Sequence, residues 1–420
     1  MDFDNVVTMD IRKNPKKLHS IVWIHGFGGS IASTPSISGG RIYIGSDDNY
    51  FYCIDAETGK AKWKFKGDGS FSNGSAVFAG NMLFIGNYDG HLYALDKDAG
   101  KLIWKFKTGD KISASACVHE DRICFGSLDN YVYCLDMKGK EVWRFKTSRI
   151  IMSSPVVNGG ICYIGSHDGY LYAIDADNGE EIWRFKTGGA ILNTLNHSFP
   201  IKDGVIYFHS YDGFVYAADS KSGSELWRFR MSHGATEVPF LHEKTLFIAT
   251  NDPKHGTIHA IDINSHKEVN RFTIEKESGD VSRFVYKNKI YFGSSRGNFY
   301  AVDKDSMKEI WQFRTDGPVW CGASLYKNMV IFGSWDCHVY ALDGDNGKEI
   351  WRFVTSTKIQ SPETVEEETP IELEIERKEE IDDKEEKYIE RKTIEVFEDF
   401  YRTKSEYIHK SEYASESNYK

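Results

Sequence analysis

The sequence predicts an all-β fold, an eight-bladed β-propeller of four-stranded antiparallel blades, followed by a charged C-terminal tail. Three observations lead to this prediction: one phrase recurs eight times, its copies lie one blade length apart, and each repeat contains four strand-like runs. The phrase closes each repeat, as in AIDADNGEEIW at 173–183, and its aspartates lie 39–44 residues apart, a spacing typical of propeller blades. These aspartates are Asp55, Asp96, Asp136, Asp175, Asp219, Asp262, Asp303 and Asp343.

The four strands of a blade are clearest in the fourth repeat. Each run is rich in β-branched and aromatic residues and is bounded by Gly, Asp or Asn; the runs are 151–157, 161–166, 170–175 and 181–186. Between the second and third runs, Asp168-Gly169 supplies the positive φ of a tight turn. In the last run Trp183 and Phe185 alternate with basic residues. We therefore expect the aromatic side chains between blades and the cations on the outer edge, where they discourage strand addition.

The recurring phrase resembles the tryptophan-docking motif of pyrroloquinoline-quinone (PQQ)-like propellers, Ala-x-Asp-x-x-x-Gly-x-x-x-Trp, over roughly residues 20–356. That family includes quinoprotein alcohol dehydrogenases, non-catalytic scaffolds such as the barrel-assembly lipoprotein of outer membranes, and sensor domains. The fold alone does not choose among them. The predicted domains are an N-terminal extension at 1–18, the propeller at 19–356 and an acidic tail at 357–420, which is partly helical or disordered.

The charge of the chain is concentrated in its tail. Residues 361–420 contain 20 acidic and 10 basic residues, which accounts for the whole net charge of −10, so the rest of the chain is neutral. A neutral body argues against a nucleic-acid binder, which needs a surface that neutralises phosphates. No apolar run is long enough to span a membrane. Without a secretory signal at the N-terminus, and with seven cysteines but no Cys-x-x-Cys spacing, the expected location is the cytoplasm.

The inner strands of the repeats are expected to line a central channel. Aligned on the second strand of each repeat, they place mostly small hydroxyl residues on one ring, as crowding near the axis requires: Thr34, Ser75, Ser115, Ser154, Ser198, Val238, Ser282 and Gly322. Two positions earlier, on the same strand face, come Ala32, Asn73, Ser113, Met152, Asn196, Thr236, Asp280 and Trp320.

Departures from the repeat concentrate in units five to eight. Asn270 replaces the docking Trp, Met307 the turn Gly, His209 a glycine of the second strand and Arg296 the hairpin Asp. Before the first repeat, 22–29 looks like an extra copy of the end of a last strand, placed at the closure of the ring.

These departures predict a ligand site at the mouth of the channel. Trp320 would stack on the ligand and Arg283 would bind an anionic group. The remaining polar contacts would come from Asp280, Glu237, Asn196 and Asn73. The alternative is that Trp320 fills the channel and the polar residues hold water.

A non-catalytic scaffold for protein interactions is the predicted function. Quinoprotein dehydrogenases, by resemblance, would bring Ca²⁺ held by Glu, Asn and Asp, a catalytic Asp, long inter-blade insertions and often a vicinal Cys-Cys disulfide. No Cys-Cys pair and no long insertions occur here, and Walker A, HExxH and zinc-type motifs are absent from the sequence. We therefore expect no enzyme activity and no cofactor, with PQQ and Ca²⁺ as the alternative. The alternative function is a propeller that senses a small molecule or quinone, and after it a PQQ-dependent dehydrogenase.

Protein partners are the expected ligands, bound through a propeller face and through the tail. Aromatic residues at the second hairpin of several repeats are candidate contacts: Tyr88, Tyr211 and Trp335. In the tail, 370–408 has a composition that favours helix and a thin apolar stripe. It is either a solvated tether or an amphipathic segment that folds on a partner or pairs with itself.

Overall fold

In the computed structural model, residues 29–71, 73–191, 199–231, 239–251, 255–275 and 279–355 are described, the backbone alone at 251, 275 and 279–284. Phe27–Lys358 make up one compact unit, and the rest of the chain, which forms a second unit, lies outside the described residues. The described residues form 32 strands in eight four-stranded sheets, and each sheet consists of four consecutive strands. All strand pairs are antiparallel, so the predicted eight-bladed propeller is confirmed.

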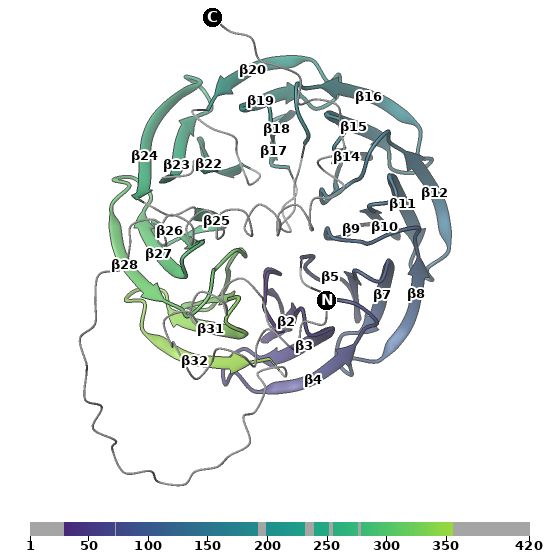
Figure 1. Ribbon diagram of the computed structural model, residues 1–420. Helices are drawn as coiled ribbons and strands as arrows, with labels where there is room; N and C mark the ends of the chain where they lie inside the picture. The colour runs from purple at the N-terminus through teal and green to yellow at the C-terminus, as the bar shows by residue number, and fades with distance from the viewer. Residues whose placement is uncertain are drawn as a thin grey trace, which may run out of the picture. The chain divides into compact units, whose positions relative to one another are not determined.

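Each blade takes its strands in chain order from the inside of the ring to the outside (Figure 1). Blades 1 to 4 consist of β1 (Ser36–Ser38), β2 (Arg41–Gly45), β3 (Tyr50–Asp55), β4 (Ala61–Lys66), β5 (Val77–Ala79), β6 (Met82–Gly86), β7 (His91–Asp96), β8 (Leu102–Lys107), β9 (Cys117–His119), β10 (Arg122–Gly126), β11 (Tyr131–Asp136), β12 (Glu141–Lys146), β13 (Val156–Asn158), β14 (Ile161–Gly165), β15 (Tyr170–Asp175) and β16 (Glu181–Lys186).

Blades 5 to 8 repeat this order with longer strands in blade 6. They consist of β17 (Ile201–Lys202), β18 (Val205–Ser210), β19 (Phe214–Asp219), β20 (Glu225–Arg230), β21 (Phe240–His242), β22 (Thr245–Asn251), β23 (His255–Asp262), β24 (Lys267–Glu275), β25 (Gly279–Tyr286), β26 (Lys289–Ser294), β27 (Asn298–Asp303), β28 (Glu309–Arg314), β29 (Ser324–Tyr326), β30 (Met329–Gly333), β31 (His338–Asp343) and β32 (Glu349–Val354). No helix occurs among these described residues, and hence none that could cross a membrane.

The innermost strand of a blade is shorter than the sequence predicts. In blade 4 the expected run begins at 151, whereas β13 begins at Val156. The preceding backbone is bonded elsewhere: Ile151 N donates to Ser127 O of blade 3 at 3.2 Å, and Gly165 N donates to Ser153 Oγ at 2.9 Å. Ile151 therefore connects blade 4 to blade 3, while Ser153 bonds to β14 of its own blade through its side chain and does not extend the backbone ladder.

The tryptophan-docking motif joins each blade to the next. Trp143 of blade 3 donates from Nε1 to Ala176 O of blade 4 at 2.9 Å. Its ring lies on Gly179, where an added Cβ would come within 2.8 Å of the Trp143 Cδ2 atom. Because Gly179 also has a φ of +79°, both its conformation and its contact require the absence of a side chain.

Where the motif is broken, other side chains replace its contacts. In blade 6, Asn270 stands for the docking Trp and donates from Nδ2 to Asp305 O at 2.8 Å. Met307 replaces the glycine that such a Trp would cover; it is 5% exposed and joins the core between blades 6 and 7. His266 replaces the glycine opposite Trp227 and stacks on that ring, with centroids 4.9 Å apart. The broken repeats therefore retain their inter-blade packing.

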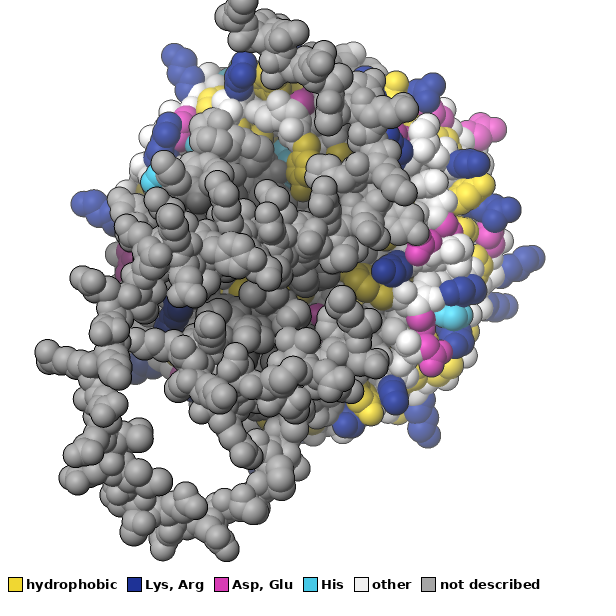
Figure 2. Space-filling view, viewed as in Figure 1, with side chains coloured by type: hydrophobic (Ala, Val, Ile, Leu, Met, Phe, Trp, Pro, Cys, Tyr) yellow, Lys and Arg dark blue, Asp and Glu magenta, His cyan; other side chains and the backbone are white. Residues whose placement is uncertain are grey.

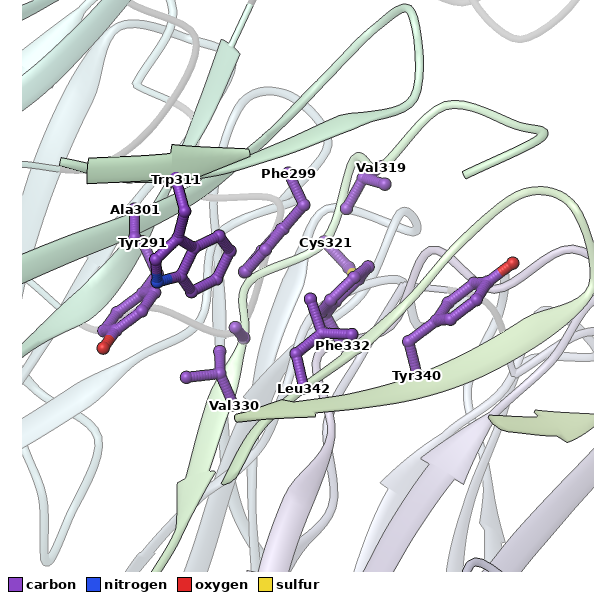
Figure 3. Packing of buried hydrophobic residues seen from close by; sticks show 11 residues of the cluster. Tyr291, Phe299, Ala301, Trp311, Val319, Cys321, Val330, Phe332, Tyr340 and Leu342 are labelled. Atoms are coloured by element: carbon purple, nitrogen blue, oxygen red, sulfur yellow. The ribbon is translucent and has the colours of Figure 1, made fainter. Parts of the chain in front are cut away.

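Buried aromatic and aliphatic side chains fill the space between adjacent blades. Figure 3 shows the cluster between blades 7 and 8, in which Phe299 and Phe332 stack with ring centroids 3.9 Å apart and planes inclined by 8°. The blades therefore form one continuous core around the ring, with a cluster at each inter-blade boundary.

The ring closes between blades 8 and 1 by the same contacts that join other blades. Trp351 donates from Nε1 to Ala56 O at 3.1 Å. Thr355 donates from Oγ1 to Gly29 O at 2.7 Å, which places the end of the predicted extra copy at the closure; residues 22–28 lie outside the described residues. No strand is shared between the two blades, because each described blade is made of four consecutive strands.

Candidate binding site at the channel and its mouth

The predicted hydroxyl ring connects neighbouring blades. Ser115 Oγ accepts a hydrogen bond from Ser75 N at 2.9 Å, and Ser154 Oγ accepts one from Ser115 N at 3.1 Å. Across the closure, Thr34 Oγ1 accepts from Gly322 N at 2.9 Å. Crowding near the axis is therefore not the only reason for small hydroxyl residues at these positions. Each of the three hydroxyls just described accepts a hydrogen bond from a buried backbone N–H of the preceding blade.

The inner strands of blades 8, 1, 2, 3 and 4, together with the ring residues Thr34, Ser75, Ser115 and Ser154, line a cavity of about 530 Å³. Its volume lies in the range of small-ligand pockets, which is on the order of 300–1,000 Å³. The lining comprises hydroxyl, small and apolar side chains without any charged one: Thr34, Pro35, Ser36, Ser75, Ala76, Val77, Phe78, Ser115, Ala116, Cys117, Val118, Ser154, Pro155, Val156, Ala323 and Ser324.

Blade 7 departs from the ring that the sequence alignment predicts. In β25, Val281 pairs with Phe292 and Val285 pairs with Ile290, so three residues of β25 face one residue of β26. This bulge contains Ser282, which the alignment had placed on the ring. The register instead puts Asp280 opposite Gly293 of β26. The alignment failed because a bulge inserts residues without changing the hydrophobic pattern.

Trp320 is not among the residues that line the cavity, and its ring contacts Trp335. Both side chains are half-buried, and their rings pack edge to face with centroids 4.5 Å apart and planes at 73°. Trp335 is held in the β30–β31 hairpin, where its N–H donates to Pro318 O at 2.9 Å. One edge of Trp320 is thus already covered by a partner ring from its own blade.

The other residues of the predicted ligand site are not brought together by the described structure. Asn73 is half-buried at the start of blade 2. Asp280 and Arg283 belong to β25, but their side chains lie outside the described ones, as do all atoms of Glu237 and Asn196. The ligand site at the mouth therefore stays a prediction.

The three aromatic candidates for partner contacts occupy one equivalent position. Each directly precedes the aspartate of a second hairpin, and its backbone N–H donates to the connection that leads into its blade from the previous one. The bonds are Tyr88 N to Ser70 O at 3.0 Å, Tyr211 N to Ala190 O at 3.0 Å and Trp335 N to Pro318 O at 2.9 Å. Tyr211 is 51% exposed, whereas Tyr88 and Trp335 are half-buried. The three side chains therefore belong to the same face of the propeller, in blades 2, 5 and 8.

His167 occupies this hairpin position in blade 4. Its backbone N–H donates to Ile150 O at 3.1 Å, and its Nε2 atom is buried with no partner among the described residues. Burial, together with the nearby positive charge of Arg149, lowers the pKa of His167 to about 4. The imidazole is therefore neutral at physiological pH and does not contribute a positive charge to the face.

Blade 6 contains a buried polar chain that the repeat analysis did not find. Thr250 Oγ1 lies 2.9 Å from His259 Nε2, His259 Nδ1 lies 3.1 Å from Glu268 Oε1, and Glu268 pairs with Arg271 at 2.6 Å. The order hydroxyl, imidazole, carboxylate is that of a nucleophile with its base and orienting acid. Thr250 and His259 are each 2% exposed, so no substrate reaches the hydroxyl.

In the sequence, this hydrogen-bonded series of side chains is indicated by a histidine at a position where other repeats have a tyrosine. In six other blades a tyrosine OH donates to the Oδ2 atom of the hairpin aspartate four residues earlier: Tyr52, Tyr93, Tyr133, Tyr172, Tyr216 and Tyr340. His259 replaces this tyrosine in blade 6, opposite Arg271 of β24. A ring with two nitrogens reaches two partners, so the network serves to satisfy the buried histidine.

Six of the seven cysteines are buried, among them the two at the docking-motif alanine, as expected. Cys53 and Cys134 are fully buried. Burial raises the pKa of the Cys53 thiol to about 11. A hydrogen bond with Cys124, together with burial, raises the pKa of Cys134. All seven cysteines are free thiols.

A metal or quinone site finds no support in the described part of the channel. Among the described residues, no group of three or more His, Cys, Asp or Glu side chains is placed to hold a metal ion. The carboxylates of PQQ need cations or Ca²⁺ as partners, and the described cavity lining has no charged side chain. Those described residues do not fit the cofactor, whereas the side chains of Asp280, Arg283, Glu237 and Asn196 lie outside them.

Comparison with known proteins identifies the family. The family model described as "Outer membrane protein assembly factor BamB", built on PQQ-like repeats, matches residues 16–123, 88–195, 167–255 and 254–372. The chain belongs to this PQQ-like propeller family. The predicted resemblance is thereby confirmed over nearly the whole propeller. A search of curated proteins finds no match.

Solved structures with the same fold have different roles. A computationally designed protein matches with a TM-score of 0.64 and 15% identity over 75% of this chain and 96% of its own. BamB from Moraxella catarrhalis matches with a TM-score of 0.59 and 17% identity, over 74% and 91% respectively. A quinohemoprotein alcohol dehydrogenase from Pseudomonas putida matches with a TM-score of 0.61 and 14% identity, over 77% and 71%. At these identities the likeness shows the fold of a PQQ-like propeller and leaves the function open.

Proposed function

We propose that this PQQ-like propeller is a non-catalytic scaffold that binds protein partners through the face formed by its second hairpins. The observation that carries the proposal is the placement of Tyr88, Tyr211 and Trp335 at one hairpin position on that face. Large aromatic side chains are enriched at protein interfaces, where they supply contact area at a low entropic cost. Lys111 Nζ lies 5.5 Å from the ring centroid of Tyr88, which adds a cation beside one of the three aromatics.

Two further points support a scaffold. The matched family model is named after an assembly factor, which is a role in building other proteins into a structure. A computationally designed protein shares the fold over 96% of its own chain, so the fold by itself implies no catalytic role. The proposal includes the tail as a second contact element and a cytoplasmic location, both of which stay predictions.

Partner capture with a face variant tests the scaffold. In the full-length protein, Tyr88→Ala with Tyr211→Ala removes two anchors without disturbing the Trp320–Trp335 pair. We expect the recovery of crosslinked partners, quantified by mass spectrometry, to fall at least ten-fold. The control is Leu226→Ala on the outer rim, which removes a side chain that is 52% exposed and should retain every partner. Equal recovery with the face variant and the wild-type protein would rule out this face.

A small-molecule sensor is the second candidate, and the cavity of about 530 Å³ is the observation that favours it. Titration with PQQ and Ca²⁺, followed by tryptophan fluorescence, tests it beside a Trp320→Ala variant. Saturable quenching that disappears in the variant would place a ligand at the mouth and favour the sensor. Absence of specific quenching would remove this cofactor and leave the scaffold.

A further inference from the structure

The outermost strands carry a positive charge that declines along the chain. With Lys and Arg counted as +1 and Asp and Glu as −1, β4 carries +3 and β8 carries +2. The strands β12, β16 and β20 carry +1 each, and β24, β28 and β32 each sum to zero. Lys and Arg side chains project outward from the rim along β8 and β12 (Figure 2). The rim is therefore most basic at the first blade.

The decline has local causes in the sequences of the outermost strands, first of all in their first residue. In β12, β16, β20 and β32 the first residue is a glutamate that pairs with the arginine three residues on, as in Glu181–Arg184 at 3.3 Å and Glu349–Arg352 at 2.6 Å. The sum falls further to zero because β24 contains two glutamates, and because Gln312 in β28 and Val354 in β32 replace basic residues. In β4 and β8 this position is Ala61 and Leu102. The lysines of these strands therefore lack the glutamate that neutralises their counterparts.

β4 is an open edge with two different faces. Among the described residues it pairs only with β3. Lys62, Lys64 and Lys66 are exposed on one face, and the half-buried rings of Trp63 and Phe65 alternate with them on the other. Lys62 pairs with Asp55 at 3.0 Å, and Lys64 lies over the Tyr50 ring at 4.4 Å. The edge thus offers backbone donors and acceptors beside a basic face and an aromatic face.

The chain contains a hexapeptide whose pattern is complementary to β4. Residues 371–376 read Ile-Glu-Leu-Glu-Ile-Glu, with strict alternation of apolar and acidic residues over the six-residue length of β4. Alternation with period two is the pattern of a strand, not of a helix. As a neighbouring strand it would set its acids on the lysine face and its apolar residues on the aromatic face.

We propose that the outer edge of β4 binds the chain's own residues 371–376 as an added strand. The 15 residues from 356 to 370 span up to about 50 Å when extended, whereas neighbouring sheets pack about 10 Å apart. Lysines at an edge discourage pairing with neutral or basic strands. An acidic strand meets the opposite condition, so the same lysines select it. This site is separate from the hairpin face, and the inference does not depend on the proposed function.

The test uses full-length variants and a labelled peptide with the sequence of residues 369–378, TPIELEIERK. Glu372→Gln, Glu374→Gln and Glu376→Gln together weaken the internal segment. Fluorescence anisotropy is expected to show at least ten-fold tighter peptide binding by this variant than by the wild-type protein, whose edge is already occupied. Adding Lys64→Glu and Lys66→Glu should abolish binding.

Two controls keep the outcome specific. Arg184→Glu with Lys186→Glu makes the same charge change at the equivalent positions of β16 and should leave peptide binding intact. A peptide of the same composition with grouped residues, TPIILEEERK, should not bind. The proposal is overturned if the triple glutamine variant binds no more tightly than the wild-type protein, if the β16 change abolishes binding as well, or if the grouped peptide binds equally. Tyr88→Ala with Tyr211→Ala should not affect the peptide, which separates this site from the scaffold face.

Discussion

At the scale of single residues, the repeat determines the backbone hydrogen bond at a given position, whereas burial determines the protonation state of the side chain there. The residue before the aspartate of the second hairpin has the same backbone bond in blades 2, 4 and 5, and there it is Tyr88, His167 and Tyr211. The tyrosines can be buried or exposed without a change of charge near neutral pH. The histidine is buried, and desolvation favours its neutral form.

The depressed pKa of His167 predicts a pH dependence of stability. The folded-state pKa of about 4 lies below the ordinary histidine pKa of 6.5, so the unfolded chain binds more protons between these two values. The contribution of His167 is complete above pH 6.5 and is lost as the pH falls toward 4. We expect the free energy of unfolding to drop between pH 7 and 4.5 by about 2 kcal/mol more in the wild-type protein than in His167→Tyr. Urea unfolding at both pH values measures this difference, and equal drops would contradict it.

At the scale of elements, the tryptophan of the previous blade packs on the turn between the last two strands of a blade and determines which residue that turn can contain. Gly179 needs its positive φ and its missing side chain because Trp143 lies directly on it. Gly204, in the β17–β18 turn, has a similar φ of +78°, but no atom lies within 4 Å of the place of its Cβ. A comparison of the two glycines therefore distinguishes the effect of a positive φ, which both have, from the effect of the inter-blade contact, which only Gly179 makes.

Alanine substitutions at these two glycines are therefore expected to differ. Gly204→Ala carries only the cost of a left-handed conformation, about 1 kcal/mol. Gly179→Ala adds a clash with the Trp143 ring, for a total of about 3 kcal/mol. Chemical denaturation gives both values. If the two substitutions cost the same, the docking contact does not constrain the turn.

At the scale of the whole molecule, the ring depends on contacts between neighbouring blades. Every blade has its own four strands, and blades 8 and 1 meet through the same kinds of contact as the others. Stability in such an array is close to a sum of blade and boundary terms. A hydroxyl that accepts a bond from the neighbouring blade should therefore contribute to the stability of the whole ring.

Ser115 and Ser113 provide a matched pair for this expectation. Both are buried in blade 3, but Ser115 Oγ accepts from Ser75 N, whereas Ser113 Oγ has no partner among the described residues. Ser115→Ala leaves a buried N–H without its acceptor and should lower the free energy of unfolding by about 1–2 kcal/mol. Ser113→Ala should change it by less than about 0.5 kcal/mol, because no hydrogen bond is lost. Urea unfolding of the two variants decides the point, and equal effects would contradict the role of the ring.

The candidate site could be predicted only in part. The sequence placed Trp335 in a hairpin and the hydroxyl residues on the inner ring, because period-two alternation and turn signals fix local position. It did not show the Trp320–Trp335 contact, the inter-blade role of the hydroxyls or the Thr250–His259–Glu268 chain. Each of these joins residues through side-chain direction or across blades, which no local pattern encodes.

The sequence by itself determined the fold class, the number of blades and the tryptophan-docking motif, since eight copies of one local pattern repeat the same strand and turn chemistry. The tertiary structure decided the start of β13, the bulge in β25 and the packing that replaces lost motif residues. The start of β13 and the replacement packing depend on hydrogen bonds and volumes shared with the neighbouring blade, and the bulge depends on how β25 pairs with β26. A periodic sequence specifies which segments form strands. Contacts with other strands and with adjacent blades determine where each strand begins, where it bulges and which residues it packs against.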